Sequence, residues 1–359
     1  MKIALVHDWL IHMRGGEKVL EALAEVFPEA TLYTLFSRPS HLSPSLKQMK
    51  IKNSVLQFFP GIRWCYRWLL PLLPFFIRTL RIGEADLVIS SSHCVAKGVR
   101  IPKGASHLCY CHTPMRYLWG FGEVYFEGFP TWFVAALRPL LDWLREWDVA
   151  TSQQVDHFFC NSETVRDRIR RIYNRDATVI HPPVDTEFFK PNSDPQRRDY
   201  YLIVSALTPY KRVDIAINAF NGWGRKLWIA GDGPSRGGYE RLVKTGNIRF
   251  LGKVSDEDLV NLYARAKALL FPQEEDFGIV PLEAQACGTP VIAFAQGGAL
   301  ESVEEGVFFD KQTPEAIRRA VTEFESRSFD RDSLREQALK FDKATFKNKI
   351  RQAIENVVS

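Results

Sequence analysis

The sequence predicts an α/β protein with two doubly wound parallel sheets, each covered by helices. Its 359 residues exceed the size of one comfortable hydrophobic core, so two domains of ordinary size are expected. Short apolar runs alternate with segments of helical periodicity along the whole chain, which is typical of parallel sheets. The composition, 46% hydrophobic and 25% charged, is that of a globular protein.

Strand-like runs recur in both halves of the chain. In the first half they lie at 2–9, 31–36, 85–92, 106–113, 157–162 and 177–184. Helical segments are expected there near 16–27, 131–155 and 163–173. In the second half, strand-like runs separated by helices lie at 200–207, 226–233, 247–253, 267–272 and 290–294. Ser255 and Thr313 stand where helix N-caps are expected, the latter followed by a proline.

The best candidate for a linker is the segment 185–199, DTEFFKPNSDPQRRD, which is polar, contains two prolines and lacks periodicity. We therefore place the domain boundary near residue 190, giving domains 1–190 and 191–359. Periodicity does not decide which domain the C-terminal helix packs on. Ligands of doubly wound sheets bind at the carboxyl ends of the strands, so the chemistry is expected in the loops that follow strands.

Composition excludes several other classes of protein. The six cysteines contain no C-x-x-C pair and fall mostly in apolar runs, which suits a reducing cytoplasm. Cys109 and Cys111 precede His112, but strand alternation turns the histidine away from both thiols, which argues against a metal site. The N-terminus lacks the features of a signal peptide, and the apolar run 68–77 is about half the ~20 residues that span a bilayer.

One segment is strongly basic, because no acidic residue lies between Glu29 and Glu84. Within residues 55–82, arginines alternate with tryptophan, tyrosine and phenylalanine, the composition of a helix lying in an anionic lipid interface. We therefore expect peripheral binding to the inner face of the cell membrane. A core helix with a solvated basic side is the alternative, and no nucleic-acid-binding motif accompanies the segment.

Two loops are candidates for chemistry. In the first, the strand at 2–9 leads through Gly15 and Gly16 into a helix whose N-terminus could receive a phosphate. No G-x-G-x-x-G dinucleotide fingerprint is present, and an ordinary turn is the alternative reading of the two glycines.

The second loop connects the strand KALLFP to the helix IVPLEAQAC. Glu275 lies just beyond the strand and Glu283 in the helix, so both carboxylates could accept hydrogen bonds from sugar hydroxyls. The backbone N–H groups of Phe277, Gly278 and Ile279 could bind an anion. An exposed acidic turn is the alternative for Glu275.

This second loop resembles the E-x(7)-E signature of the retaining family 4 glycosyltransferases, which have the GT-B fold of two Rossmann-like domains. The resemblance continues along nearly the whole chain, in the stretches RGGEK, CHTPMRYLW, NSETVRDRI, IHPPVDTEFF, SALTPYKRVDIAINAF, IAGDGP and ACGTPVIAFAQGGALESV. Each stretch alone is weak, but the ordered series is specific. It implies an acceptor-binding N-terminal domain and a C-terminal domain that binds a nucleotide sugar.

The resemblance also implies roles for single residues. Glu275 would contact the donor sugar and Glu283 the ribose, while Lys211 would neutralise the diphosphate as it leaves. Gly16 would allow close approach of the donor, and His112 would line the sugar and acceptor side; without the resemblance, a satisfied core histidine is the ordinary reading. One departure is Ala206, because many members carry an arginine there. Arg212, next to Lys211, is a candidate to compensate.

The expected activity is therefore transfer of a hexose from a nucleotide diphosphate sugar to an acceptor hydroxyl, with retention of the anomeric configuration. No cofactor or metal is expected. The motifs most resemble those of bacterial mannosyltransferases, so GDP-mannose is the expected donor, and a lipid-linked acceptor in cell-surface polysaccharide synthesis fits the basic segment. The alternatives are a UDP-sugar donor and a non-catalytic nucleotide-sugar-binding subunit.

Overall fold

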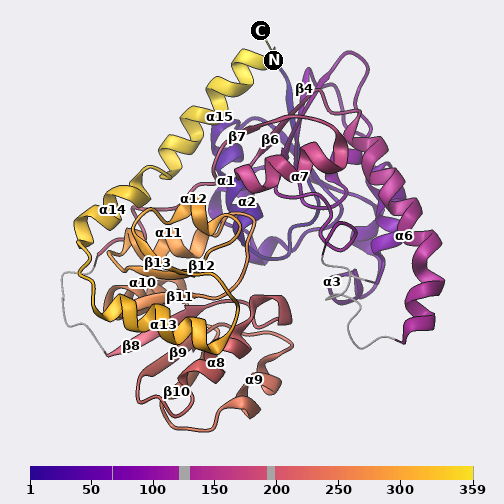
Figure 1. Ribbon diagram of the computed structural model, residues 1–359. Helices are drawn as coiled ribbons and strands as arrows, with labels where there is room; N and C mark the ends of the chain where they lie inside the picture. The colour runs from indigo at the N-terminus through magenta and orange to yellow at the C-terminus, as the bar shows by residue number, and fades with distance from the viewer. Residues whose placement is uncertain (67, 121–129, 192–198, 359) are drawn as a thin grey trace. The chain divides into compact units, whose positions relative to one another are not determined.

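The computed structural model describes residues 1–66, 68–120, 130–191 and 199–358. They form two compact units: residues 1–183 together with the C-terminal segment from Phe346, and Val184–Thr345 (Figure 1). Most of the linker predicted at 185–199 lies outside the described residues, because 192–198 are not described. The two units are taken separately below.

The first unit contains a seven-stranded parallel sheet in the order β3-β2-β1-β4-β5-β6-β7. Its strands are β1 (Ile3–His7), β2 (Thr31–Thr34), β3 (Lys50–Asn53), β4 (Leu87–Ser92), β5 (Ser106–Cys111), β6 (His157–Cys160) and β7 (Ala177–Val179). Its helices are α1 (Gly15–Val26), α2 (Pro44–Gln48), α3 (Ile62–Cys65), α4 (Leu73–Ile77), α6 (Thr131–Ser152), α7 (Glu163–Tyr173) and α15 (Lys343–Val358). Short 3-10 turns lie at η1 (Pro39–His41), η2 (Val55–Phe58), η3 (Leu70–Leu72) and η4 (Ala96–Gly98).

Helices cover both faces of this sheet because neighbouring strand residues point to opposite sides. Leu5 of β1 belongs to a buried cluster with side chains of α1 and α15, whereas Val6 belongs to a cluster on the other face with α4 and Leu144 of α6. The last helix of the chain thus packs on the first unit, through three buried side chains spaced four apart: Phe346, Ile350 and Ile354.

The second unit contains a six-stranded parallel sheet in the order β10-β9-β8-β11-β12-β13. Its strands are β8 (Tyr200–Val204), β9 (Lys226–Ala230), β10 (Ile248–Gly252), β11 (Ala268–Phe271), β12 (Val291–Phe294) and β13 (Gly306–Phe309). Its helices are α8 (Val213–Phe220), α9 (Arg236–Leu242), α10 (Asp256–Arg265), α11 (Ile279–Ala286), α12 (Ala299–Ser302), α13 (Pro314–Glu325) and α14 (Arg331–Leu339), with a 3-10 turn η5 (Pro209–Lys211).

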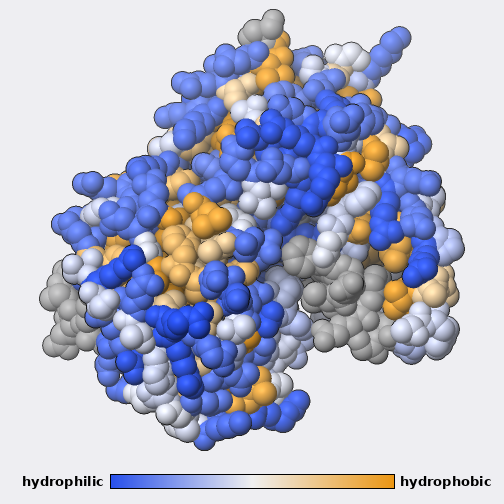
Figure 2. Space-filling view, viewed as in Figure 1, coloured by the Kyte–Doolittle hydropathy of each residue, from blue (hydrophilic) through white to orange (hydrophobic). Residues whose placement is uncertain are grey.

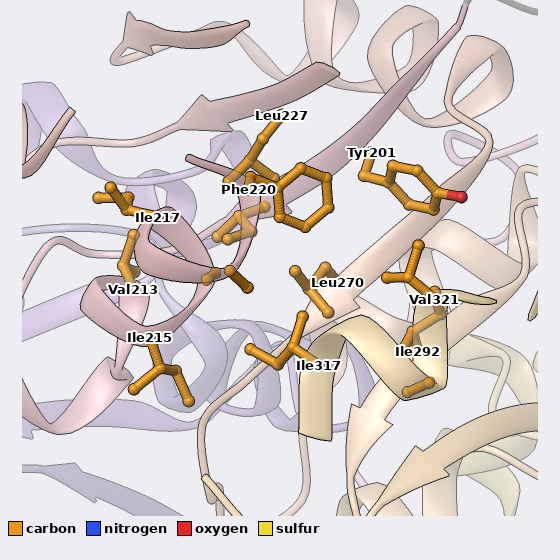
Figure 3. Packing of buried hydrophobic residues seen from close by; sticks show 14 of the residues in the cluster. Tyr201, Val213, Ile215, Ile217, Phe220, Leu227, Leu270, Ile292, Ile317 and Val321 are labelled. Atoms are coloured by element: carbon orange, nitrogen blue, oxygen red, sulfur yellow. The ribbon is translucent and has the colours of Figure 1, made fainter. Parts of the chain in front are cut away.

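One face of the second sheet is covered by α8 and α13. Their apolar side chains, with Phe220 and Ile317 among them, interlock with Leu270 and Ile292 from the central strands (Figure 3). The opposite face packs against α10 and α11, where Tyr263 and Ala284 meet Leu269. Two doubly wound parallel sheets are therefore confirmed as the fold class.

Most predicted strands and helix starts are confirmed, including both N-caps. Ser255 accepts a hydrogen bond from the backbone N–H of Asp258 at 3.1 Å, and Thr313 accepts one from Ala316 at 3.3 Å. In the described part of the basic segment, 55–66 and 68–82, the helices and turns are short, including those around Pro71 and Pro74. A proline removes a backbone donor and breaks a helix that would otherwise continue.

No helix in the described ranges combines the length and hydropathy that a membrane-spanning segment requires. Much of the face seen in Figure 2 is hydrophilic, with apolar residues in smaller patches between charged ones. The cysteines are free in the described residues, and all except Cys65 are buried.

Candidate active site

Each sheet has one position where the direction of winding reverses. In the first sheet it lies between β1 and β4, and in the second between β8 and β11. The loops leaving such adjacent strands run to opposite faces, so a crevice forms at the carboxyl edge and is the usual ligand site of a doubly wound sheet. Both candidate loops predicted from the sequence begin at these positions, one after β1 and the other after β11.

In the second unit, an ion pair connects the two loops at the reversal point. Lys211 lies in η5 after β8, and its ammonium contacts the Glu275 carboxylate in the loop after β11. Both side chains are largely buried, with 12% and 16% of their surfaces exposed. The ammonium also lies 5.1 Å from the centre of the Tyr210 ring. The arrangement holds a cation and a carboxylate ready at the carboxyl edge of the sheet.

Glycines let the loops at this edge pack backbone against backbone. A Cβ on Gly298 would lie 2.1 Å from the Cα of Phe277, and one on Gly297 would lie 2.3 Å from the carbonyl oxygen of Glu275. After β9, Gly231 approaches Ser205 in the same way, at 1.8 Å from its carbonyl oxygen. Such distances exclude any side chain, so these glycines fix the positions of the loops that carry Lys211 and Glu275.

Glu283 lies in α11 and is 6% exposed, with the hydroxyl of Tyr263 donating to its carboxylate at 3.1 Å. The helix begins after Gly278, whose φ of 90° favours glycine. Among the described residues, no hydrogen-bond partner is found for the backbone N–H of Gly278 or Ile279. The N-terminus of α11 therefore presents donors at the same edge of the sheet.

Arg212 follows Lys211 with a left-handed φ of 52°. Its guanidinium lies 3.5 Å from the Asp214 carboxylate and donates to the side chain of Gln312 at 3.2 Å. The positive charge of Arg212 is thus already engaged within the second unit. Whether it substitutes for the arginine that Ala206 replaces stays a prediction.

In the first unit, Ser91 lies between the imidazole rings of His7 and His112. Nδ1 of His7 lies 3.0 Å from the Ser91 carbonyl and 3.1 Å from its hydroxyl, so Nδ1 carries the proton. The Ser91 hydroxyl lies at hydrogen-bond distance, 2.8 Å, from Nε2 of His112. Burial, the largest cause, lowers the pKa of His7 to about 4 and that of His112 well below 6.5. His112 is therefore neutral at pH 7.

The buried carboxylate of Asp8 ties the loop after β1 to the loop after β4. It accepts hydrogen bonds from the backbone N–H groups of residues 93–96 at 2.6–3.0 Å, and Nδ1 of His93 lies 3.0 Å away. Burial alone would raise the pKa of Asp8, but His93 and the N–H donors lower it well below its usual value. Burial lowers the pKa of His93, yet the Asp8 charge and hydrogen bond outweigh it, so the net pKa is raised.

The glycine loop lies beside these histidines. A Cβ on Gly16 would be 3.5 Å from Nε2 of His112, so the first turn of α1 passes along the imidazole ring. The backbone N–H of Arg14, at the N-cap, donates to the Glu17 carboxylate at 3.1 Å. No partner for the N–H of Gly15 or Gly16 is found in the described part of the chain.

Each unit thus brings together its own subset of the predicted site residues. The second unit gathers Lys211, Glu275, Glu283 and the 277–279 backbone, and the first gathers Gly15, Gly16 and His112. Sequence reasoning missed Asp8, Ser91 and His93, although Asp8 was visible as a charge inside an apolar run. Within the described residues, no group of three or more His, Cys, Asp or Glu side chains is arranged to hold a metal ion.

Comparison with known proteins identifies the family. Residues 13–188 match the family described as Glycosyltransferase Family 4, and residues 184–341 match Glycosyl transferases group 1. The chain belongs to the family 4 glycosyltransferases.

Among relatives of this glycosyltransferase, the D-inositol 3-phosphate glycosyltransferase of Mycolicibacterium smegmatis is 34% identical over 178 residues, covering 43% of this chain and 41% of the relative. The enzyme of that name from Salinispora tropica is 31% identical over 208 residues, covering 47% of this chain and 43% of the relative. The chain therefore matches less than half the length of these curated relatives. Neither is named as a mannosyltransferase, so these relatives do not support the closer resemblance to that group, which rests on the sequence motifs alone.

Solved structures show the GT-B fold. The sucrose-phosphate synthase of Thermosynechococcus elongatus superposes with a TM-score of 0.76 at 18% identity, covering 99% of both chains. HepE of Anabaena, solved in complex with UDP and glucose, superposes with a TM-score of 0.71 at 17% identity, again covering 99% of both. At such low identity the likeness concerns the fold.

Proposed function

We propose that this glycosyltransferase moves a hexose from a nucleotide diphosphate sugar to an acceptor hydroxyl, with retention of the anomeric configuration. The observation that carries the proposal is the pair of Lys211 and Glu275 at the reversal point of the second sheet. A sugar diphosphate has hydroxyl donors at one end and phosphate acceptors at the other. A carboxylate and an ammonium held side by side match these two ends.

The leaving diphosphate is the centre of the proposed chemistry. As the glycosidic bond to phosphate breaks, negative charge grows on the leaving oxygen, and fixed donors aimed at that charge lower the barrier. Lys211 and the N–H groups of Gly278 and Ile279 are such donors. Glu275 keeps the ammonium in place through their ion pair. For retention, we infer that the leaving phosphate accepts the proton of the acceptor hydroxyl on the same face of the sugar.

GDP-mannose is the proposed donor, supported by the form of the CHTPMRYLW and PYKRVD stretches. A UDP-sugar is the second candidate, favoured by HepE, whose solved complex contains UDP and glucose. A non-catalytic nucleotide-sugar-binding subunit is the third, favoured by Ala206. We place the acceptor on a lipid carrier in the synthesis of a cell-surface polysaccharide.

A panel of nucleotide sugars separates these donors. A bound ligand raises apparent stability by RT ln(1 + [L]/Kd), so a donor present at about a hundred times its Kd stabilises the protein by about 2.7 kcal/mol. We expect GDP-mannose to raise the Tm more than UDP-glucose or UDP-galactose does, and to release GDP in a hydrolysis assay. A larger shift with a UDP-sugar would reverse the choice of donor. A Tm shift without release of nucleotide under any acceptor condition would favour the subunit.

We also propose that the surface formed by residues 55–82 binds an anionic membrane. Several of its apolar side chains are exposed, among them Phe58 at 86% and Trp64 at 85%. Arg67 of this segment lies outside the described residues. Arg78, Arg81 and Arg100 line one hollow of about 470 Å³ beside Phe75. Among the described residues, none of their guanidinium groups has an ion pair or hydrogen bond. Apolar side chains beside unpaired arginines suit a layer of acidic lipid headgroups.

The triple variant Arg78→Ala, Arg81→Ala, Arg100→Ala is expected to bind phosphatidylglycerol-containing vesicles about a hundredfold more weakly, because each basic side chain near an anionic surface contributes about 1 kcal/mol. Sedimentation with vesicles at rising salt measures this. Alanine at three exposed basic residues of the second unit, Arg241, Lys253 and Arg319, is the charge-matched control. Equal loss of binding in both triple variants would show that net charge alone, and not this surface, drives the association.

A further inference from the structure

The ion pair of Lys211 and Glu275 is held by the backbone at both of its ends. The carbonyl oxygen of Glu275 accepts a hydrogen bond from the N–H of Gly298 at 2.9 Å, and Glu275 forms a parallel bridge with Gly297. These contacts tie the loop after β11 to the loop after β12. The N–H of Lys211 donates to the carbonyl oxygen of Thr208 at 3.1 Å. The carboxylate is therefore fixed beside the ammonium by the fold of the second unit itself.

The carboxylate offsets the charge that Lys211 presents to an anion. Both side chains are largely buried, so little water surrounds them to screen their charges. Two more acids flank Glu275 in the sequence, Glu274 and the buried Asp276. An anion that binds Lys211 therefore meets a negative charge at the same place. The loop after β11 favours a ligand that brings hydrogen-bond donors together with its phosphates.

The donor and the product of the proposed reaction differ in what they present to Glu275. A nucleotide sugar presents sugar hydroxyls, which donate hydrogen bonds to a carboxylate, and its diphosphate is esterified at both ends. The released nucleoside diphosphate has lost the sugar. Its terminal phosphate receives the proton of the acceptor hydroxyl and then loses it to water, because this proton has a pKa of about 6. The product therefore has more negative charge than the donor and lacks the hydroxyls.

We propose that Glu275 makes the donor site of the second unit discriminate against the nucleoside diphosphate product, which promotes its release after transfer. While the sugar is bound, its hydroxyls donate to the carboxylate, whose two oxygens can hold the ammonium and the sugar together. After transfer, the same carboxylate repels the terminal phosphate and competes with it for Lys211. The inference rests on the proposed function, because it assigns the control of product release to the same site.

Glu275→Gln tests this discrimination, because it keeps the size of the side chain and removes its charge. We expect the variant to bind GDP about tenfold more tightly than the native protein does. GDP-mannose is expected to gain less, since an amide oxygen is a weaker acceptor for the sugar hydroxyls than a carboxylate. Isothermal titration calorimetry measures the four dissociation constants. UDP with UDP-glucose, and inorganic pyrophosphate, are titrated in parallel, and pyrophosphate tests the diphosphate contact without a choice of base.

Glu325→Gln is the matched control. Glu325 accepts a hydrogen bond from Arg225 at 2.6 Å, in an ion pair whose carboxylate side chain is 28% exposed. Arg225 directly precedes β9, so this pair lies at the amino edge of the same sheet. Equal tightening of GDP in both variants would assign the effect to the net charge of the unit and overturn the proposal. Native GDP affinity in Glu275→Gln, or an equal gain for GDP and GDP-mannose, would overturn it as well.

The variant Lys211→Met shows whether the carboxylate acts through the ammonium. In this background, Glu275→Gln is expected to strengthen GDP binding by less than about threefold, because no ammonium remains for which the carboxylate and the phosphate compete. Thermal unfolding of each variant verifies that it is folded. A tenfold gain in both backgrounds would mean that Glu275 acts by direct repulsion alone and would contradict the competition for Lys211.

These measurements use binding, so their outcome is separate from that of the proposed transfer. If Glu275→Gln strengthens the binding of GDP and pyrophosphate as expected but no nucleotide sugar is ever consumed, the proposed function fails while the effect of Glu275 on the diphosphate stands. If transfer proceeds and Glu275→Gln leaves the ratio of the GDP and GDP-mannose dissociation constants at its native value, only the role of Glu275 in product release fails.

Discussion

Replacement of Lys211 by alanine is expected to lower kcat by about a hundredfold to a thousandfold, the usual cost of removing a donor that faces developing charge. The charge on the leaving diphosphate is larger in the transition state than in the bound donor. Lys211 therefore contributes more to kcat than to donor affinity, and the donor Kd is expected to weaken by less than about tenfold. Steady-state kinetics with the donor selected by the nucleotide-sugar panel, together with a direct binding measurement, separates the two effects.

Lys226→Ala is the matched control for this prediction. Lys226 lies on β9 of the same unit, has 57% of its side chain exposed and lies 4.0 Å from Asp199. Its loss removes the same charge from the unit but leaves the loops after β8 and β11, at the reversal point of the sheet, unchanged. An effect of Lys211→Ala confined to KM, with kcat unchanged, would mean that Lys211 binds donor and transition state equally well, and the proposed role would be wrong.

The fold was largely predictable because buried parallel strands are apolar runs. The strands that sequence reasoning missed are β3 (Lys50–Asn53) and β13 (Gly306–Phe309), two of the four edge strands of the sheets. In β3 an apolar residue stands between exposed lysines, and β13 is four residues long and begins with glycine. An edge strand pairs on one side only and needs fewer buried side chains, so its sequence carries a weaker signal.

The sequence predicted more of the site residues in the second unit than in the first. Glu275 and Glu283 lie in one loop and helix, so their spacing predicted that they share an edge of the sheet. His93 and Asp8 are separated by 85 positions and meet only because β1 pairs with β4, in a register that sets His7 opposite Ser91. No local pattern encodes that pairing. Asp8, a charge inside an apolar run of the sequence, was the visible sign of a buried charge network.

The loop that carries His93 is held from its other end by a second buried charge. Lys97 contacts the carboxylate of Asp148 on α6, and the two side chains are 2% and 0% exposed. The other carboxylate oxygen of Asp148 accepts hydrogen bonds from Trp119 at 2.8 Å and Tyr173 at 2.9 Å. Every oxygen of Asp148 is therefore satisfied, and the network joins the loop after β4 to α6 and α7.

Asp148→Ala is expected to destabilise the protein by about 3–5 kcal/mol, since it leaves the Lys97 ammonium buried without its counter-charge. The change in the free energy of unfolding is measured by urea denaturation, followed by tryptophan fluorescence because Trp119 and Trp147 adjoin the pair. Asp142→Ala on the same helix is the control, because its ion pair with Arg145 is exposed and is expected to contribute less than about 1 kcal/mol.

The double variant Lys97→Met, Asp148→Leu tests the reason for that loss. If the unpaired ammonium is the cause, removing both charges together is expected to be less damaging than removing Asp148 alone, since no buried charge then lacks a partner. Equal destabilisation in the single and double variants would instead assign the loss to Trp119 and Tyr173, whose donors both variants leave unpaired. In that case the hydrogen bonds, and not the ion pair, would hold the loop of His93 on α6.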